Sequence, residues 1–107
     1  MHKVREYTQY LTEGREDRMR VRIATEKAEV VQFAVQYEAL IGGTWHPIVR
    51  FDTAHIFSHK DLMHPNGRQD KQPMAFPDFK IALTFAIQDV KALWRWYRKG
   101  YEGEMKR

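Results

Sequence analysis

The alternation of apolar and polar side chains predicts three β-strands in the first half of the chain. The first begins at Arg18, and the second and third span residues 31–41 and 45–53. The polar run 25–29 and the pair Gly42-Gly43 mark the turns between them. Each strand therefore has one apolar and one polar face, which predicts an antiparallel sheet with a single buried side.

The hydrophobic pattern also predicts the register of the hairpin formed by the second and third strands. With a loop of only Gly42-Gly43, the apolar faces of the two strands would not coincide. A three-residue loop that includes Thr44 makes them coincide, so we expect this register. Pro47 has no amide proton and is expected at a β-bulge or outside the hydrogen-bond ladder. The expected pairs are Ile41 with Trp45, Tyr37 with Val49, Val35 with Phe51, Gln36 with Arg50, and Ala34 with Asp52.

The C-terminal part of the chain predicts one long amphipathic helix. Asp78 is expected to cap its start and Gly100 to end it. At roughly 30 Å, this helix is long enough to cover one face of a small sheet. Its apolar side chains recur at intervals of three and four residues, and they are Phe79, Leu83, Ala86, Ile87, Val90, Leu93, Trp94 and Tyr97.

Two further segments have shorter patterns. Residues 3–12 have apolar side chains at near-helical spacing and are followed by Gly14, which predicts a short N-terminal helix or arm. Residues 56–64 predict a fourth strand or hairpin arm, which turns at 65–67 and returns over 70–74. The chain is therefore expected to continue the sheet between the third strand and the helix.

Together these elements predict an α+β fold, an antiparallel meander sheet of about four strands with one long C-terminal amphipathic helix packed on one face. A chain of 107 residues is expected to form a single domain, because two cores of useful size would not fit. We expect the N-terminal arm or short helix in residues 1–17, the sheet in 18–76, the helix in 78–100 and a loose tail in 101–107.

The composition narrows the classes of function. The chain has no cysteine, which excludes thiolate zinc sites, iron–sulfur clusters and cysteine nucleophiles. The N-terminus has no apolar signal segment, and no apolar run is long enough to cross a bilayer, so we expect a cytoplasmic protein without a membrane partner. The net charge of +4 modestly favours a polyanionic or acidic partner.

Cationic side chains gather on the polar face of the predicted sheet. Arg18, Arg20 and Arg22 share this face and are expected near Arg50, together with Gln32, Gln36, Glu38 and Asp52. Arginine and glutamine on an open sheet face can bind a phosphate backbone. A plain alternative is that alternating charges keep an exposed strand soluble. The residues expected to contact nucleic acid are Arg18, Arg20, Arg22, Gln36, Lys60 and Lys71.

A dense group of ionisable residues follows the third strand. Arg50 and Asp52 share a strand face, and His55 and His59 lie four residues apart just beyond them. Arg50 is expected to bind a phosphate group and Asp52 to orient His55. His55 and His59, acting as base and acid, would cleave RNA through its own 2′-hydroxyl without a metal. The candidate catalytic residues are therefore Arg50, Asp52, His55 and His59.

A metal site competes with this interpretation, because five side chains in the same stretch offer nitrogen and oxygen ligands. They are Asp52, His55, His59, Asp61 and His64. Their spacing matches no zinc signature and lacks the helical HExxH arrangement, so the sequence predicts no bound metal or other cofactor. A third interpretation is that the histidines are merely exposed in a loop.

Three runs of the sequence resemble known families. The run FAVQYEALIGGTWHPIVRFDTAH is followed by HKDLMHPNG and then by ALTFAIQDVKALWRWYRKGY. They are similar to a small uncharacterised prokaryotic family and, more distantly, to TumE-type toxins of toxin-antitoxin pairs. The likeness covers residues 33–101, and its most specific part is Arg50, Asp52 and His55 in R-x-D-x-x-H, followed by His59. Ile56 stands where the TumE-like pattern has a second histidine.

The resemblance implies a toxin-like, RNA-cleaving role with an antitoxin as protein partner. Our first hypothesis is accordingly a small cytoplasmic RNA-binding or RNA-cleaving protein of toxin type. The second is a non-catalytic protein-interaction module that docks through a strand edge or an exposed Trp96, and an edge strand would also allow a homodimer. A metal-dependent hydrolase that uses the histidine and aspartate residues is the third.

Overall fold

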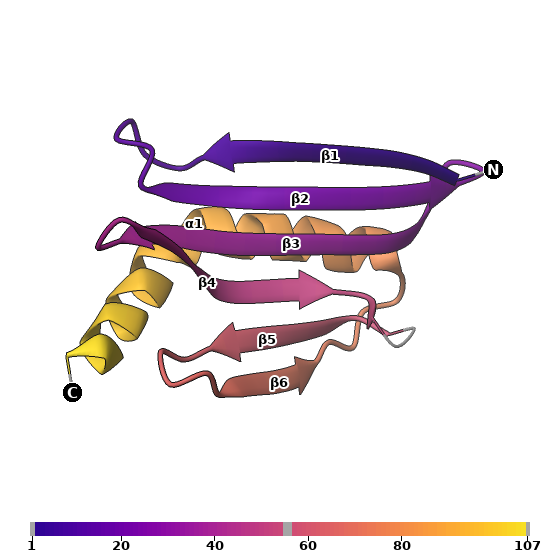
Figure 1. The fold of residues 1–107 in the computed structure, drawn as a ribbon. Helices are drawn as coiled ribbons and strands as arrows, with labels where there is room; N and C mark the ends of the chain where they lie inside the picture. The colour runs from indigo at the N-terminus through magenta and orange to yellow at the C-terminus, as the bar shows by residue number, and fades with distance from the viewer. Residues whose placement is uncertain (1, 55–56, 107) are drawn as a thin grey trace.

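A computed structural model describes residues 2–54 and 57–106 (Figure 1). In these residues, six antiparallel strands form one sheet in the order β1-β2-β3-β4-β5-β6, and a helix follows them. The α+β class and the antiparallel meander are confirmed, with six strands in place of about four. The elements are β1 His2–Tyr10, β2 Asp17–Glu26, β3 Glu29–Ile41, β4 Thr44–Asp52, β5 His59–Met63, β6 Gln69–Pro73 and α1 Phe79–Met105.

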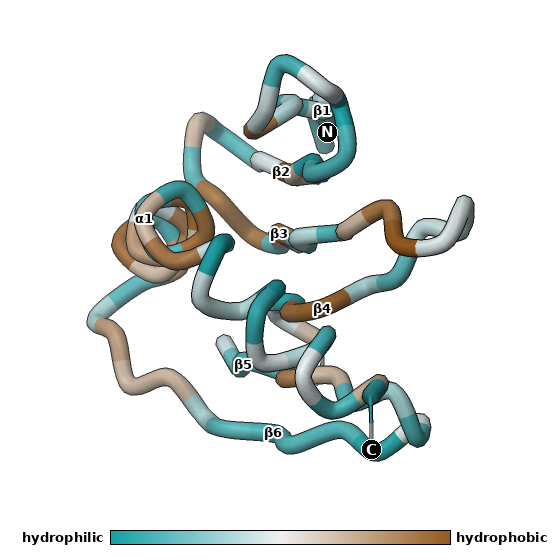
Figure 2. Tube along the Cα trace, turned by 90° about the vertical axis from the view of Figure 1, so that its left-hand side faces the viewer, coloured by the Kyte–Doolittle hydropathy of each residue, from teal (hydrophilic) through white to brown (hydrophobic). Residues whose placement is uncertain are grey.

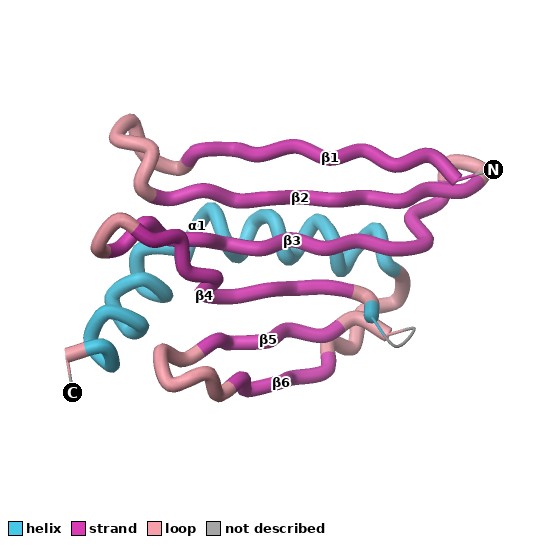
Figure 3. The backbone as a smooth tube through the Cα atoms, viewed as in Figure 1, coloured by secondary structure: helices cyan, strands magenta, loops and turns pink. Residues whose placement is uncertain are grey.

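The two strands at the edges of the sheet account for the difference in number (Figure 3). β6 is the returning arm of the predicted hairpin, whereas β1 lies where the sequence predicted an arm or short helix. Nearly every residue of β1 is exposed, and the strand pairs with β2 from His2 opposite Glu26 to Tyr10 opposite Arg18. The prediction of an arm or helix was wrong, because backbone hydrogen bonds hold this edge strand and its polar side chains show little strand pattern.

Four of the five predicted pairs in the β3–β4 hairpin are confirmed. The fifth is wrong, because Ile41 pairs with Thr44 and not with Trp45. The turn is therefore the two-residue Gly42-Gly43 loop, in which both glycines have positive φ, +60° and +81°. A tight hairpin turn requires these angles, and glycine adopts them without steric cost. The confirmed pairs are Tyr37 with Val49, Val35 with Phe51, Gln36 with Arg50, and Ala34 with Asp52.

A β-bulge reconciles the short turn with the predicted register. The register shifts by one residue next to Pro47, as the sequence predicted for this proline. At a bulge two residues oppose one, so Ile48 and Val49 both enter the core. Trp45 is turned to the opposite face, where the guanidinium carbon of Arg18 lies 3.7 Å from its ring centroid.

α1 packs on one face of the sheet, behind β3 in Figure 1 and to one side of the strands in Figure 2. Asp78 caps the helix as predicted, and its side chain accepts a hydrogen bond of 2.8 Å from the backbone of Ile81. The buried side chains between sheet and helix include Met19, Val21, Phe33, Val35, Tyr37, Val49 and Phe51 from the strands and Ala82, Ala86, Val90, Trp94, Tyr97 and Tyr101 from α1.

The helix continues past Gly100, where the sequence predicted its end, as far as Met105. Tyr101 is buried in the core, and Glu104 lies 2.8 Å from His64 on the β5–β6 hairpin. Such contacts outweigh the roughly 1 kcal/mol by which a glycine inside a helix is less favourable than alanine. The predictions of a helix end at Gly100 and of a loose tail over 101–107 were wrong for this reason.

We call the face of the sheet opposite α1 the open face. In the described part of the chain no second helix covers it. Strand alternation and register give its residues, which are Glu6, Thr8, Tyr10, Arg18, Arg20, Arg22, Gln32, Ala34, Gln36, Glu38, Arg50, Asp52, His59, Asp61 and Lys71. The residues that the sequence assigned to the polar side are therefore all found on this face.

Candidate functional site

Arginine side chains surround a shallow depression on the open face. Arg20, Arg22 and Arg50 line it together with Gln36 and Glu6, and its volume is about 330 Å³. Arg20 lies opposite Gln36, which in turn lies opposite Arg50. The side chains of Arg20 and Arg22 are 59% and 48% exposed, so their guanidinium groups are available to a ligand.

Arg18 shares the open face but is held by internal contacts. Its Nε donates a hydrogen bond of 2.6 Å to Glu38, and its guanidinium stacks on Trp45. Glu38 is buried, and the pair links β2 to β3. The predicted contact of Arg18 with nucleic acid would therefore compete with its contacts inside the protein.

A chain of hydrogen bonds connects β3 to β4 across the open face. Nε2 of Gln36 donates to Glu38 at 2.5 Å, and Oε1 of Gln36 accepts from Arg50 at 3.1 Å. Nε of Arg50 donates to Oδ2 of Asp52 at 2.5 Å. Arg50 thus lines the depression and also holds the carboxylate of Asp52, which does not line it.

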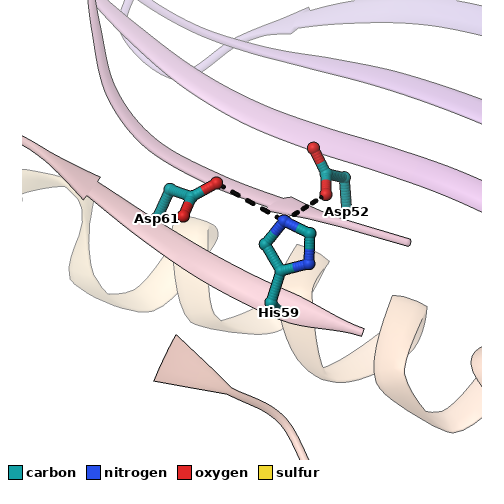
Figure 4. Close-up of side chains that lie close together, drawn as sticks. All are labelled: Asp52, His59 and Asp61. Atoms are coloured by element: carbon teal, nitrogen blue, oxygen red, sulfur yellow. Dashed lines mark ion pairs between the residues drawn. The ribbon is translucent and has the colours of Figure 1, made fainter. Parts of the chain in front are cut away.

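Asp52, His59 and Asp61 form a compact group, which we call the Asp–His–Asp cluster (Figure 4). Nε2 of His59 lies 2.7 Å from Oδ1 of Asp52 and 3.5 Å from Oδ2 of Asp61. One nitrogen and two oxygens of the three residues lie within 4.8 Å of one another. The β4–β5 register produces the cluster, because it sets Asp52 opposite His59 and Arg50 opposite Asp61. All three residues are buried.

The contacts around the Asp–His–Asp cluster differ between its members. Asp52 accepts hydrogen bonds from Arg50 and, at 3.2 Å, from the backbone N–H of Ala54. Nδ1 of His59 lies 3.4 Å from the carbonyl oxygen of Phe57. Oδ1 of Asp61 is buried and accepts no hydrogen bond from the described residues. Nζ of Lys71 lies 4.0 Å from this oxygen.

The structure brings together three of the four predicted catalytic residues, namely Arg50, Asp52 and His59. His55 lies outside the described residues. The side chain of His59 is only 2% exposed, and its Nε2 faces the two carboxylates. This position differs from that of an acid or base in direct contact with a substrate on the sheet surface.

Asp61 is the member of the cluster that the catalytic prediction left out. The signal that could have included it is the alternation His59, Lys60, Asp61 in a strand, which puts His59 and Asp61 on one face. The same alternation sends Lys60 to the other face, where its Nζ donates to the hydroxyl of Tyr97 at 2.9 Å. Lys71 does lie on the open face, whereas the structure does not bring Lys60 there.

His64 lies apart from the Asp–His–Asp cluster and joins the β5–β6 hairpin to α1. Its Nδ1 lies 2.8 Å from Glu104 and its Nε2 lies 2.7 Å from Asp70, an arrangement that we call the His64 clamp. The contacts with Glu104 and Asp70 raise the pKa of His64 above its ordinary value. The hydrogen bond to His64 lowers the pKa of Asp70 in return. His64, one of the five candidate metal ligands in the sequence, is thus a structural residue here.

Three aromatic residues of α1 differ in exposure as the sequence predicted. Trp94 and Tyr97 are buried in the core, whereas Trp96 is 67% exposed. Trp96 borders a cavity of about 350 Å³ between α1 and β5, which Ile48 and Leu62 also line. This region is the apolar surface to which a protein-interaction function would be assigned.

A family model described as a domain of unknown function, DUF7718, matches residues 1–107. The chain belongs to this family. No curated protein and no solved structure matches the chain. Among the described residues of this DUF7718 protein, no helix has both the length and the apolar character that crossing a membrane requires. The likeness to TumE-type toxins stays a resemblance of sequence motifs.

Proposed function

We propose that this DUF7718 protein binds RNA on the open face of its sheet. The observation that supports the proposal is the arrangement of Arg20, Arg22 and Arg50 around one depression. Guanidinium groups bind phosphate oxygens through pairs of parallel hydrogen bonds. Tyr10 lies on the same face and is 42% exposed, and the guanidinium carbon of Arg15 lies 5.2 Å from its ring centroid. The part of the ring that Arg15 does not cover offers a surface for base stacking. A flexible single strand can follow such a shallow surface, so single-stranded RNA is the preferred ligand.

The carboxylates on the open face balance much of the arginine charge. Glu38 pairs with Arg18, and Glu6 lies 3.2 Å from Nε of Arg22. Long-range attraction is therefore weak, and binding depends on a few direct phosphate contacts. We expect dissociation constants of roughly 10⁻⁴ to 10⁻⁶ M, a range typical of non-specific nucleic-acid binding. The affinity should decrease as salt is added.

Fluorescence anisotropy with a labelled single-stranded RNA, measured over a range of KCl concentrations, tests the proposal. The double variant Arg20→Gln/Arg22→Gln is expected to bind at least tenfold more weakly than the wild type, an order-of-magnitude estimate of two lost charge-assisted contacts. Because each phosphate contact to a single strand contributes about 0.7 to the slope of log K against log salt, the slope should fall by about 1.4.

Lys80→Gln/Lys91→Gln is the matched control, because it removes the same charge from exposed positions on α1. The control should bind RNA nearly as well as the wild type. Equal losses in both double variants would show that only net charge matters, and the proposal would then be wrong. Absence of salt-sensitive RNA binding by the wild type would also reject it.

The proposal extends to RNA cleavage beside the Asp–His–Asp cluster. Arg50 lines the depression and hydrogen-bonds Asp52, so a phosphate bound to Arg50 would lie close to the cluster. Incubation of labelled RNA with the purified protein, with and without EDTA, measures cleavage and its dependence on metal. Asp52→Asn is expected to abolish cleavage and to retain RNA binding. If the wild type binds RNA but leaves it intact in both conditions, the function is binding alone.

We propose further that RNA binding or cleavage serves a toxin-type role, with an antitoxin protein as partner. The resemblance to TumE-type toxins supports this role. Induced expression in a bacterial host should arrest growth, and Arg20→Gln/Arg22→Gln should relieve the arrest. Normal growth at a high level of folded wild-type protein would reject the toxin role. It would not affect the proposal of RNA binding.

A protein-interaction module is the alternative, favoured by the exposure of Trp96 next to the apolar cavity. Within the described residues, the edge strands β1 and β6 also offer backbone groups to a partner or to a second copy. Trp96→Ala separates the alternatives, since it should leave RNA binding unchanged if the open face is the functional surface.

A further inference from the structure

We infer that the Asp–His–Asp cluster binds a divalent transition-metal ion. The sequence predicted no metal, because the ligand spacing matches no known signature. The inference rests on the tertiary arrangement of Asp52, His59 and Asp61, and it goes beyond the proposed RNA binding, on which it does not depend.

The first argument is the direction of the lone pairs in the cluster. Nδ1 of His59 faces the carbonyl oxygen of Phe57 at 3.4 Å, and a carbonyl oxygen only accepts hydrogen bonds. Nε2 of His59 points at carboxylate oxygens of Asp52 and Asp61, 2.7 and 3.5 Å away. A neutral His59 carries its ring proton either on Nε2, donating to Asp52, or on Nδ1, facing Phe57. The second tautomer leaves the lone pair of Nε2 directed at the two carboxylates, where it can bind a metal ion together with them.

The second argument is that one carboxylate oxygen of the buried Asp61 has no hydrogen-bond donor among the described residues. This residue is 5% exposed, and Oδ1 accepts no hydrogen bond within residues 2–54 and 57–106. Lys71 approaches only to 4.0 Å, which is beyond hydrogen-bond distance. Asp52, by contrast, is paired with Arg50 at 2.5 Å. The other oxygen of Asp61, Oδ2, lies 3.5 Å from Nε2 of His59. Since a buried carboxylate with one oxygen that accepts no hydrogen bond is unfavourable, a cation bound by the Asp61 carboxylate would compensate its charge.

The donor set indicates the class of metal. One imidazole nitrogen and two carboxylate oxygens suit zinc, manganese or iron better than calcium or magnesium, which prefer oxygen ligands alone. Three protein ligands leave coordination positions for water, as in catalytic rather than structural sites. The contacts of Arg50 with Asp52 and of Phe57 with His59 would orient the ligands, as outer-shell groups do in metal sites.

Isothermal titration of the EDTA-treated, dialysed protein with Zn²⁺, Mn²⁺ and Mg²⁺ tests the inference. We expect saturable binding of one Zn²⁺ per chain, with weaker binding of Mn²⁺ and the weakest of Mg²⁺. Asp61→Asn keeps the shape of the side chain and should fold, which a thermal melt verifies. This variant should lose more than about 100-fold in Zn²⁺ affinity, because even outer-shell changes cost roughly 10–100-fold.

Two control variants locate the bound ion. Glu13→Gln removes an exposed carboxylate from the β1–β2 connection, and His64→Gln removes the histidine of the clamp. Both should bind Zn²⁺ as the wild type does. Loss of Zn²⁺ binding in His64→Gln, with full binding in Asp61→Asn, would show that the ion binds at the His64 clamp and would overturn the inference.

The competing occupant of the cluster is a proton on Nε2 of His59. NMR of the imidazole nitrogens distinguishes the two, since a protonated Nε2 that stays unchanged when Zn²⁺ is added would overturn the metal assignment. Failure to bind any of the three ions would do the same. RNA binding by the metal-free protein would leave the proposed function standing, so the two proposals fail separately.

Discussion

The two faces of the sheet are stabilised in different ways. The face under α1 is filled with apolar side chains such as Val35, Tyr37 and Phe51, which are fully buried. The open face is instead a connected set of polar contacts that runs from Arg18 through Glu38 to Arg50 and the Asp–His–Asp cluster. Apolar packing needs shape and volume, whereas each polar contact needs a particular partner at hydrogen-bond distance.

This difference explains why the candidate site built from the described residues lies on the open face. An apolar core tolerates exchange of one hydrophobic side chain for another of similar size. A polar network across paired strands forms only if each neighbouring pair of strands has the correct register. The registers of β2, β3, β4 and β5 hold their ionisable groups at fixed positions. The open face therefore combines exposed guanidinium groups with buried carboxylates, while the covered face supplies stability.

The largest effect on stability is expected from the covered face. Phe51→Ala should lower the free energy of unfolding by about 3–5 kcal/mol, because it removes a buried ring and leaves a cavity. Phe51 is fully buried and lies edge-on to Phe85 of α1, with centroids 6.3 Å apart. Urea denaturation followed by circular dichroism measures the change. A loss below about 1 kcal/mol would mean that the helix does not depend on this contact.

A smaller loss is expected when a buried acceptor of the open face is changed. Glu38→Gln should cost about 1.5–3 kcal/mol, because Glu38 accepts charge-assisted hydrogen bonds from Arg18 and Gln36. Glu6→Gln on the same face is the control, since its pair with Arg22 is exposed and contributes at most about 1 kcal/mol. Equal losses in the two variants, measured by urea denaturation, would show that the network adds nothing to an ordinary surface pair.

The His64 clamp should make stability depend on pH. Because the folded pKa of His64 is raised, its stabilisation is complete below the ordinary value of about 6.5 and is lost as the pH rises through the folded pKa. The pKa of Asp70 is lowered, so its contribution is present above about 3.9 and is lost as the pH falls through the folded pKa.

The difference in Tm between the wild type and His64→Gln should therefore be largest between about pH 4 and 6.5. It should amount to a few degrees there and shrink toward pH 9. Thermal melts across this range check the prediction. A difference in Tm that does not change with pH would show that His64 acts through packing alone.

The smallest effect on stability is expected from the exposed arginines of the depression. Arg20→Gln and Arg22→Gln should each change the free energy of unfolding by at most about 0.5 kcal/mol, as surface substitutions usually do. The same variants are expected to weaken RNA binding. Urea denaturation of these variants should therefore show that stability is retained although RNA binding is lost. A large destabilisation would mean that these guanidinium groups are structural.

The hydrophobic pattern determined much of the fold. β2, β3, β4 and α1 lie where alternation and helical spacing predicted them, and Asp78 and Pro47 have their predicted local roles. β1 was missed because a polar edge strand is held by its backbone. The helix passes Gly100 because Tyr101 and Glu104 make contacts with distant residues that no local propensity reports.

The sequence also predicted one part of the candidate site and not the other. Alternation alone puts Arg50 and Asp52 on one face, and it puts His59 and Asp61 on one face of the next strand. That these two pairs meet was decided by the β4–β5 register, which depends on the connection between the strands. Side-chain alternation is a local property of each strand, so the sequence can report it directly. Register is set between strands by connections and hydrogen bonds, and only the tertiary structure reveals it.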